Sequence, residues 1–472
     1  MILTAQVLGM IAVIASIIGL AVLVLSLALT GPDWVTGAAV TLTFSNAGVL
    51  ASLSGAPSAS SMLPYVLLVL PAAYQILVKR APIVWGWPMT GMLAFVVIAM
   101  VSTVLSPRPG DSFATLIQWL LEGLLFFFAL TNSIRSVAAL RRCVQGMVIA
   151  GAVVGLAVAY QHYQGNYYNT YFGLAQVSDP YDITSSAPSV LADGETTGQF
   201  RSAGMIGEPN FFAMIMTALT PWAAYLAFTG ATLVCRLGWV AAWLFISCAV
   251  FFSYSRGALV AAGAVLVLMA LWGVMPRKSL LYLTVAAGVA VTAVPSLAER
   301  LATLGTVVSS GGGAEASSAG RLSEVGAAWA VFSSHSVLGV GPGQFPLYYQ
   351  RYLGLSGGGV HSGQGARNAH NIVLGVAADV GLVGLAGFTL LVGVVVLGLI
   401  RTRRSPRFRA LATASLVSIS LYLGCSAFLH LAYARYLWLF LALSAALISI
   451  AASEVRRASP RQSRRYADVS TR

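Results

Sequence analysis

Long runs of apolar residues recur along the chain, and short polar segments separate them. A run of about 20 apolar residues is what an α-helix needs to cross the hydrocarbon core of a bilayer. The runs are continuous, whereas the strands of a membrane barrel would alternate with a period of two. The pattern therefore predicts an all-α polytopic membrane protein. Its expected transmembrane helices, about twelve by this length criterion, lie near residues 7–29, 62–78, 83–105, 112–131, 140–162, 208–228, 231–252, 256–275, 279–296, 370–400, 409–429 and 433–452.

The stretch 32–60 is treated differently, because it contains Pro32, Asp33, Asn46 and many Ser and Thr residues. These residue types favour turns and caps over the interior of an apolar helix. We expect a loop or a re-entrant segment here. No Lys or Arg precedes the first apolar run, so a cleavable signal peptide is not expected.

Composition agrees with a membrane protein. Hydrophobic residues make up 58% of the chain and charged residues 9%. Soluble globular proteins carry roughly 25% charged residues, so the composition excludes that class. The four cysteines stand singly in or beside the expected spans and predict neither a disulfide framework nor a thiolate metal site.

The basic residues in short loops indicate the orientation, because Lys and Arg accumulate on the cytoplasmic side. Most of the 27 Lys and Arg residues fall on one side. They are Lys79, Arg80, Arg135, Arg141, Arg142, Arg236, Arg277, Lys278, Arg401, Arg403, Arg404, Arg407, Arg409, Arg456, Arg457, Arg461, Arg464, Arg465 and Arg472. Both termini are then cytoplasmic, and the basic tail 453–472 is a topology anchor with affinity for anionic membrane lipids. This placement argues against a nucleic-acid partner, although the net charge is +13.

The opposite face carries arginine without lysine. Its members are Arg108, Arg201, Arg256, Arg300, Arg321, Arg351, Arg367 and Arg435. Because the guanidinium group binds phosphate oxygens in a bidentate manner, this face would suit a phosphate-bearing ligand. Solvated loop charges are the alternative interpretation.

Two long loops, 163–207 and 297–369, lie on this same face. The predicted organisation is an N-terminal membrane bundle over residues 1–296, which includes the first loop, then the large loop, then C-terminal membrane helices over 370–452 and the basic tail.

Within the large loop the apolar residues recur at helical spacing, and they are Leu322, Val325, Trp329 and Phe332. They predict an amphipathic helix from Arg321 to His335 that lies on the bundle. Arg321 would then occupy the first turn, where a cation opposes the helix dipole unless an anion is bound. An arginine that pairs with Glu324 or extends into solvent explains the position equally well.

Two more arginines stand at span boundaries. Arg256 follows Ser255 at the outer end of a span, where it could hold a phosphate or extend to the lipid headgroups. Arg201 lies in the segment that leads to the helix start at Pro209. Glu208 could orient an arginine there or simply pair with one.

His370 is the most reactive group expected on this face. It stands where a polar segment meets a long apolar run, and the helix dipole there would favour the neutral ring that can act as a base. Asn371 could fix its tautomer or hold a sugar hydroxyl. Asp379 lies nine residues further along the helix, about 13 Å deeper, and is predicted to be a buried structural acid. Since none of the five histidines shows HExxH or comparable spacing, we expect no metal and no cofactor.

The motifs together resemble the O-antigen ligase and polymerase superfamily. They run Gly320-Arg321-Leu322, then Val337-Leu338-Gly339-Val340-Gly341-Pro342-Gly343-Gln344-Phe345, then His370-Asn371 followed by Asp379, Gly381 and Gly384. Upstream, Arg201 with Pro209-Asn210 and Ser255-Arg256-Gly257-Ala258 resemble two further motifs of the superfamily. Many relatives carry Glu where Asp379 stands. Within the superfamily the chain looks most like the WaaL-type O-antigen ligases.

The resemblance implies a glycosyltransferase of the bacterial inner membrane with its active site facing the periplasm. Such enzymes move O-antigen polysaccharide from undecaprenyl diphosphate to the lipid A-core oligosaccharide in lipopolysaccharide biosynthesis, without metal or ATP. The motif histidine activates the acceptor hydroxyl, and the motif arginines hold the diphosphate. These roles fall on His370, Arg256 and Arg321. Residues implied to contact substrate are Arg201, Arg367, Asn371, Asn210 and Glu208.

Direct attack by the acceptor would invert the anomeric centre. Two relatives with the same donor remain open as alternatives, a Wzy-type polymerase and a protein O-oligosaccharyltransferase. A transporter or flippase is a further alternative, but it would predict internal repeats and broken helices near the midplane. No repeat is evident in the sequence.

Overall fold

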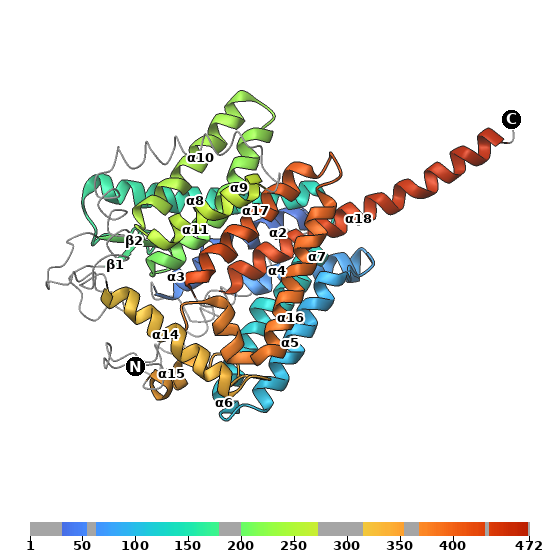
Figure 1. Ribbon diagram of the computed structural model, residues 1–472. Coiled ribbons are helices and arrows are strands. Elements are labelled where there is room, and N and C mark those ends of the chain that lie inside the picture. Colours follow the sequence, from blue (N-terminus) through green and yellow to red (C-terminus); the bar gives the residue numbers. More distant parts are fainter. Residues whose placement is uncertain are drawn as a thin grey trace, which may run out of the picture.

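The computed structural model describes residues 31–53, 63–178, 200–271, 315–353, 368–429 and 434–470. They form a bundle of inclined helices with one small hairpin (Figure 1). In this part of the chain eight helical segments are long and apolar enough to cross a membrane. They are α5 (Trp87–Val104), the continuous helix α6–η3–α7 (Pro109–Ser133), α8 (Val137–Gln164), α9 (Pro209–Thr229), α10 (Leu233–Phe252), α16 (Ile372–Thr402), α17 with the following 3₁₀ turn (Arg409–Phe428) and the first part of α18 (Ala434–Ser470). This architecture is that of a multi-pass membrane protein.

Two shorter apolar helices lie at further expected spans. They are α4 (Leu63–Ala73), which continues into the π-helical turn η2 (Tyr74–Val78), and α11 (Arg256–Leu271). The expected spans 7–29 and 279–296 lie outside the described residues. The total of about twelve, which came from the lengths of the apolar runs, therefore stays a prediction.

For residues 32–53, the described part of the stretch 32–60, the expectation of a loop is wrong, and the alternative of a re-entrant segment stays a prediction. These residues form α2 (Pro32–Phe44) and α3 (Ala47–Leu53), and α2 packs on α8 and α4. Pro32 occupies the first helical turn, where its missing N–H costs nothing. The hydroxyl groups of Thr36, Thr41 and Thr43 each donate to the carbonyl oxygen four residues earlier, so they need no water inside the bundle.

Helix α2 runs along most of the depth of the bundle. Asp33 at its start forms an ion pair with Arg142 near the start of α8, with 2.9 Å between Oδ2 and Nη1. At its other end the Asn46 side chain donates to the Met205 carbonyl oxygen at 2.9 Å, beside the start of α9. These two contacts join α2 to α8 at one end and to the segment before α9 at the other.

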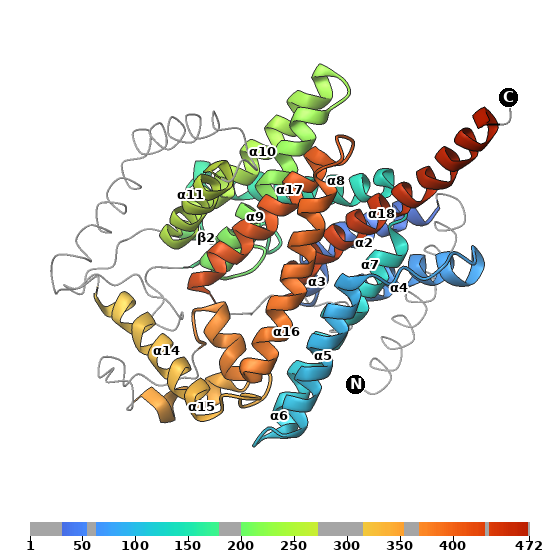
Figure 2. The ribbon, with the colours of Figure 1, turned by 45° about the vertical axis from the view of Figure 1, so that its right-hand side comes forward.

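A cluster of aromatic rings lies where α5, η3 (Trp119–Leu125), α16 and α18 meet. The Phe95 ring packs on three other aromatic rings, those of Trp119, Phe388 and Trp438, with centroids 5.4–5.9 Å apart. Helices α5 and α16 lie side by side along their length (Figure 2). Gly91 permits this approach, since a Cβ atom there would meet the Leu391 backbone at 3.2 Å.

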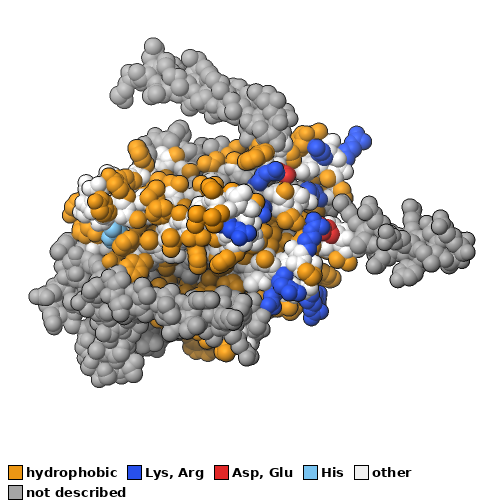
Figure 3. All heavy atoms as spheres, turned by 90° about the horizontal axis from the view of Figure 1, so that it is seen from above, with side chains coloured by type: hydrophobic (Ala, Val, Ile, Leu, Met, Phe, Trp, Pro, Cys, Tyr) orange, Lys and Arg blue, Asp and Glu red, His pale blue; other side chains and the backbone are white. Residues whose placement is uncertain are grey.

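The two ends of the bundle differ in character. Lys and Arg side chains gather at the end where α18 leaves the bundle, and apolar side chains cover the middle (Figure 3). The other end carries β1 (Gln176–Ser178), β2 (Arg201–Gly204), α14 (Glu315–Ser334) and α15 (Phe345–Leu353). The antiparallel pair β1–β2 was not expected in an all-α chain. All the predicted site residues that the structure describes lie at this second end.

Candidate functional site

The glycine-rich segment between α14 and α15 is hydrogen-bonded to the backbone of α16 at a point where that helix is interrupted. At Gly381 the helix adopts φ 69° and ψ −170°, which interrupts the helical hydrogen bonds. The exposed backbone groups on either side of the break pair with the segment instead. Ala378 and Asp379 accept from the Val340 and Gly341 amides, while Leu382 and Val383 donate to the Ser336 and Val337 carbonyl oxygens. A Cβ atom on Gly381 would lie 2.2 Å from the Val337 oxygen, so only glycine fits this junction.

The Asp379 side chain adds further hydrogen bonds between α16 and this segment. Its two carboxylate oxygens accept from the amides of Gly343 and Phe345, at 2.9 and 3.0 Å. On α5, the Ser102 hydroxyl donates to the Leu338 carbonyl oxygen at 2.6 Å. Just beyond α5, Ser106 donates to the Val340 carbonyl oxygen, also at 2.6 Å. The prediction that Asp379 is a structural acid agrees with these contacts. We call residues 336–345 together with Asp379 and Gly381 the clamp, because they fix where α14 ends relative to α16.

Helix α14 differs from its prediction in two respects. It begins at Glu315, so Arg321 lies in the second turn and the helix-dipole argument made for a first-turn arginine does not apply. The buried face is also different, because Trp329 is 58% exposed. The residues that are buried are Glu324, Ala327, Ala328 and Val331. Ala327, Ala328 and Val331 pack in one buried cluster with Ala378 of α16, and the small alanines let the two helices approach closely.

The buried face of α14 brings a carboxylate to His370. Glu324 is 1% exposed, and its Oε2 lies 2.6 Å from the His370 Nδ1. The carbonyl oxygen of Asn368 lies 3.2 Å from the same nitrogen. The backbone of His370 is left-handed, with φ 39°, which is uncommon for a residue with a side chain. Such strain persists only where the surrounding structure imposes it and often marks a functional position.

A second group of polar side chains joins the starts of α9 and α11 to β2. The Arg201 guanidinium donates to the Ser253 carbonyl oxygen at 3.2 Å and to the Asn210 amide oxygen at 3.0 Å. That oxygen also accepts from the Ser255 hydroxyl at 3.0 Å. Glu208 accepts from the Asn210 amide nitrogen and from the Phe211 backbone, which makes it the N-cap of α9. We call Arg201, Glu208, Asn210 and Ser255 the arginine network.

Arg256 follows directly and is the first residue of α11. A cation is unfavourable at a helix N-terminus, whereas an anion is favoured there by the dipole and the unpaired N–H groups. The helix end and the guanidinium charge would therefore both favour an anionic ligand at this position. Tyr254, two residues before Arg256, has a left-handed backbone with φ 49°. A residue with strained backbone therefore stands near Arg256, as one does at His370 itself.

One short turn, η5 (Ser426–Phe428), connects the two groups. Asn371 caps α16 by accepting from the Leu374 amide, and its side-chain nitrogen donates to the Ala427 carbonyl oxygen at 3.1 Å. Phe428 packs against the position of Gly257. A narrow cleft between the groups is lined by Asn210, Ser255, Gly257, Ala258, Cys425, Phe428 and Leu429. The starts of α9, α11 and α16 thus converge on η5, and three helix N-termini make this region favourable for negative charge.

The structure brings together six of the eight predicted site residues, which are His370, Asn371, Arg201, Asn210, Glu208 and Arg256. The backbone of Arg321 lies on α14, and its side chain lies outside the described part. Arg367 lies outside the described residues altogether.

Of the other histidines, His162 and His335 lie in the described part of the chain. His162 stacks on Phe252 with 4.0 Å between the ring centroids, and its Nε2 lies 3.0 Å from the Ser202 hydroxyl. His335 directly follows α14, as predicted.

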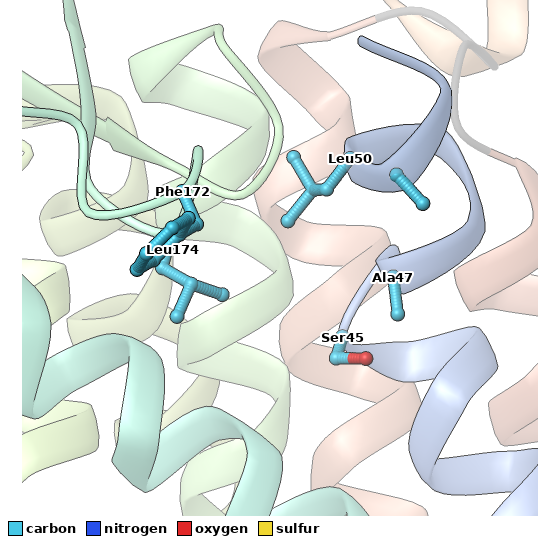
Figure 4. A pocket seen from close by; sticks show the side chains of 6 residues that line it. Ser45, Ala47, Leu50, Phe172 and Leu174 are labelled. Carbon is cyan, nitrogen blue, oxygen red and sulfur yellow. The ribbon is translucent and has the colours of Figure 1, made fainter. Parts of the chain in front are cut away.

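Two further hollows lie away from the arginine network. One, of about 250 Å³, lies between the α2–α3 turn and residues 172–174 and is lined by Ser45, Ala47, Leu50, Ala51, Phe172 and Leu174 (Figure 4). The other, of about 460 Å³, is an apolar groove between α8 and α10, with Val153, Leu156, Trp239 and Phe245 among its lining residues. No charged side chain lines either hollow, so neither could hold a diphosphate.

Two residues that contact the predicted site residues were not themselves predicted to belong to the site. Ser255 appeared only as part of a motif, and Glu324 appeared only as a possible partner of Arg321. A signal for Glu324 was present, because it stands three, four and seven residues before Ala327, Ala328 and Val331 and therefore on one helix face with them. An acid on an otherwise apolar face needs a partner.

The comparison with protein families agrees with this geometry. Residues 240–389 match the family model described as O-antigen ligase. The family match supports the O-antigen ligase and polymerase superfamily. The matched segment contains Arg256, Glu324, the clamp and His370, and it supports an enzyme that acts on lipid-linked polysaccharide at a membrane. No curated protein matches the chain.

Proposed function

We propose that the protein is an O-antigen ligase that transfers O-antigen polysaccharide from undecaprenyl diphosphate to the lipid A-core oligosaccharide. The observation that carries this proposal is that the segments bearing His370 and Arg256 meet at one turn, η5, where the next residues, Asn371 and Gly257, lie against Ala427 and Phe428. A base and an anion-binding helix start at neighbouring positions are what glycosyl transfer from a diphosphate requires. The match of residues 240–389 to the O-antigen ligase family supports the same class of reaction.

In the proposed reaction the acceptor hydroxyl gives its proton to the neutral His370 ring as its oxygen bonds to the anomeric carbon. The bond from that carbon to the diphosphate oxygen breaks, and undecaprenyl diphosphate leaves with the electron pair. Arg256, Arg321 and Arg201 stabilise the charge that develops on the leaving group. Attack from the side opposite the diphosphate inverts the anomeric centre. No metal takes part in this proposal.

The arginines have different tasks in this proposal. Arg201 is held by the Ser253 carbonyl oxygen at the end of α10 and by Asn210 at the start of α9, so its position is fixed before substrate arrives. Arg256 adds its charge to the N-terminus of α11. A fixed guanidinium need not reorganise when charge appears, and this is why preorganised donors accelerate such reactions.

The lipid part of the donor has an apolar surface available. The groove between α8 and α10 lies below the outer end of α10, where Ser253 contacts Arg201. A polyprenyl chain that left the arginine network could lie along this groove. The Lys and Arg side chains at the opposite end of the bundle (Figure 3) support a cytoplasmic location for that end in this proposal. The site then faces the periplasm of the bacterial inner membrane.

The proposal is tested with purified protein, undecaprenyl-diphosphate glycan and three separate acceptors. Transfer to lipid A-core alone is the expected result. Elongation of a second lipid-linked glycan would instead indicate a polymerase, and transfer to Ser or Thr of a protein would indicate a protein glycosyltransferase. Either result would replace the proposed acceptor.

The proposed contact of Arg256 with the diphosphate is tested with Arg256→Lys, which keeps the charge but loses bidentate contact. We expect weaker donor binding from this variant. The exposed Arg108 at the start of α6 offers a control, and Arg108→Lys should bind donor as the wild type does. Equal donor affinity in Arg256→Lys and wild type would contradict the assignment.

A further inference from the structure

A buried acid from one helix faces the proposed base at the start of another. Glu324 lies on the packed face of α14 with Ala327, Ala328 and Val331, and His370 stands just before α16. An unpaired carboxylate in an apolar environment is costly to bury, so an acid on that face is expected to have a polar or charged partner. The carboxylate oxygen lies 2.6 Å from the imidazole Nδ1, which is within the distance of an ion pair.

We infer that Glu324 is the positioning residue of His370, holding the ring proton on Nδ1 so that Nε2 carries the lone pair that accepts the proton. This inference rests on the proposed function. Two oxygen atoms lie close to Nδ1, the Glu324 Oε2 at 2.6 Å and the Asn368 carbonyl oxygen at 3.2 Å. Both are acceptors. A bare nitrogen lone pair at these distances would be repelled by both oxygens, so the neutral ring keeps its hydrogen on Nδ1.

The backbone directs the ring toward this partner. His370 adopts φ 39°, a conformation that a residue with a Cβ atom rarely takes. The clamp, which follows α14 in the chain, joins it to α16 through Asp379 and the amides of Gly343 and Phe345. Because both helices are fixed, the distance between the carboxylate and the ring does not depend on flexible side chains alone.

Glu324 has a second effect during the reaction. When the acceptor hydroxyl proton moves to Nε2, the ring becomes an imidazolium cation with both nitrogens protonated. The carboxylate next to Nδ1 stabilises that cation and itself stays ionised. The proton leaves Nε2 to water after undecaprenyl diphosphate has departed. No other reactant is needed.

The experiment compares Glu324→Gln and Glu324→Asp with wild type in the purified full-length protein. We expect kcat to fall about 10²–10³-fold in Glu324→Gln, within the range of general-base effects, while the KM for the donor stays unchanged. Glu324→Asp keeps the charge on a shorter side chain and should retain an intermediate rate. Glu454→Gln is the matched control, since Glu454 pairs with Arg407 at 2.7 Å at the other end of the bundle and should leave both constants unchanged.

A spectroscopic measurement separates positioning from support of the fold. In protein labelled with ¹⁵N-histidine, the His370 signals are assigned by their loss in His370→Asn. The wild type should show the Nδ1–H tautomer, and Glu324→Gln should shift the population toward Nε2–H. A wild-type ring protonated on Nε2 would overturn the inference without reference to any variant.

The kinetic outcomes also separate this inference from the proposed function. If His370→Asn abolishes transfer while Glu324→Gln transfers at the wild-type rate, Glu324 is not the positioning residue and the base assignment stands. If His370→Asn transfers at the wild-type rate, the base assignment itself fails. If Glu324→Gln does not fold, Glu324→Asp and the wild-type tautomer decide the question.

Discussion

Removing the Asp379 carboxylate should loosen the clamp and thereby separate α14 from α16. In Asp379→Ala the amides of Gly343 and Phe345 lose their acceptors, which lie at 2.9 and 3.0 Å. A hydrogen bond to a charged group contributes about 1.5–3 kcal/mol. Phe345 is buried and would have no water to replace its partner, whereas Gly343 is exposed and would.

We therefore expect the variant to lose the free energy of one full hydrogen bond and part of a second, about 3 kcal/mol. A change of this size shifts the equilibrium between the fastened and the loosened clamp about 100-fold. Because the clamp fixes the approach of Glu324 to His370, the transfer rate should fall with it.

Thermal unfolding with a thiol-reactive dye measures the effect on stability, since Cys143 and Cys425 are buried free thiols that become reactive on unfolding. We expect the midpoint to fall by a few degrees, given the usual relation between free energy and midpoint in large domains. The exposed acid Asp111, at the start of α6, provides the control variant Asp111→Ala, which should unfold as the wild type does. An Asp379→Ala variant with wild-type midpoint and wild-type rate would refute the clamp.

Two further predictions concern the backbone break and the arginine network. Gly381→Ala should lower the unfolding midpoint and the transfer rate, because a Cβ atom at φ 69° would lie 2.2 Å from the Val337 oxygen; Gly393→Ala, where nothing lies within 4 Å, is its control and should be neutral. Asn210→Ala removes an acceptor of Arg201 and should weaken donor binding about 10-fold, the equivalent of one hydrogen bond to a charged group. A donor-binding isotherm measures this, and an unchanged Kd would show that Arg201 needs no help from Asn210.

Much of the fold follows from the periodicity of the sequence. The long apolar runs predicted the positions of α5, α8, α9, α10, α16, α17 and α18 because a bilayer demands continuous apolar helices. The same reasoning failed at α2, since it treated Pro32, Asp33 and the threonines as signs of a loop. Inside a bundle these residues are satisfied by a helix start, an ion pair with Arg142 and hydroxyl bonds to the preceding turn.

The sequence predicted which residues belong to the site better than it predicted which of them contact one another. Charge placement and motifs indicated His370, Arg256 and Arg201, because each stands at a boundary between a polar segment and a span. Glu324 was not predicted as the partner of His370, since the two are far apart in sequence and only the packing of α14 on α16 joins them. The face of α14 was also mistaken, because large apolar residues were expected to pack where small alanines do.

The central claim is that His370 takes the proton from the acceptor hydroxyl. The most direct test is single-turnover transfer by His370→Asn after loading with donor, because asparagine tolerates the left-handed backbone at this position and should preserve the fold. The account predicts unchanged donor affinity and a transfer rate about 10²–10⁴-fold below wild type. Transfer at the wild-type rate by the donor-loaded variant would contradict it.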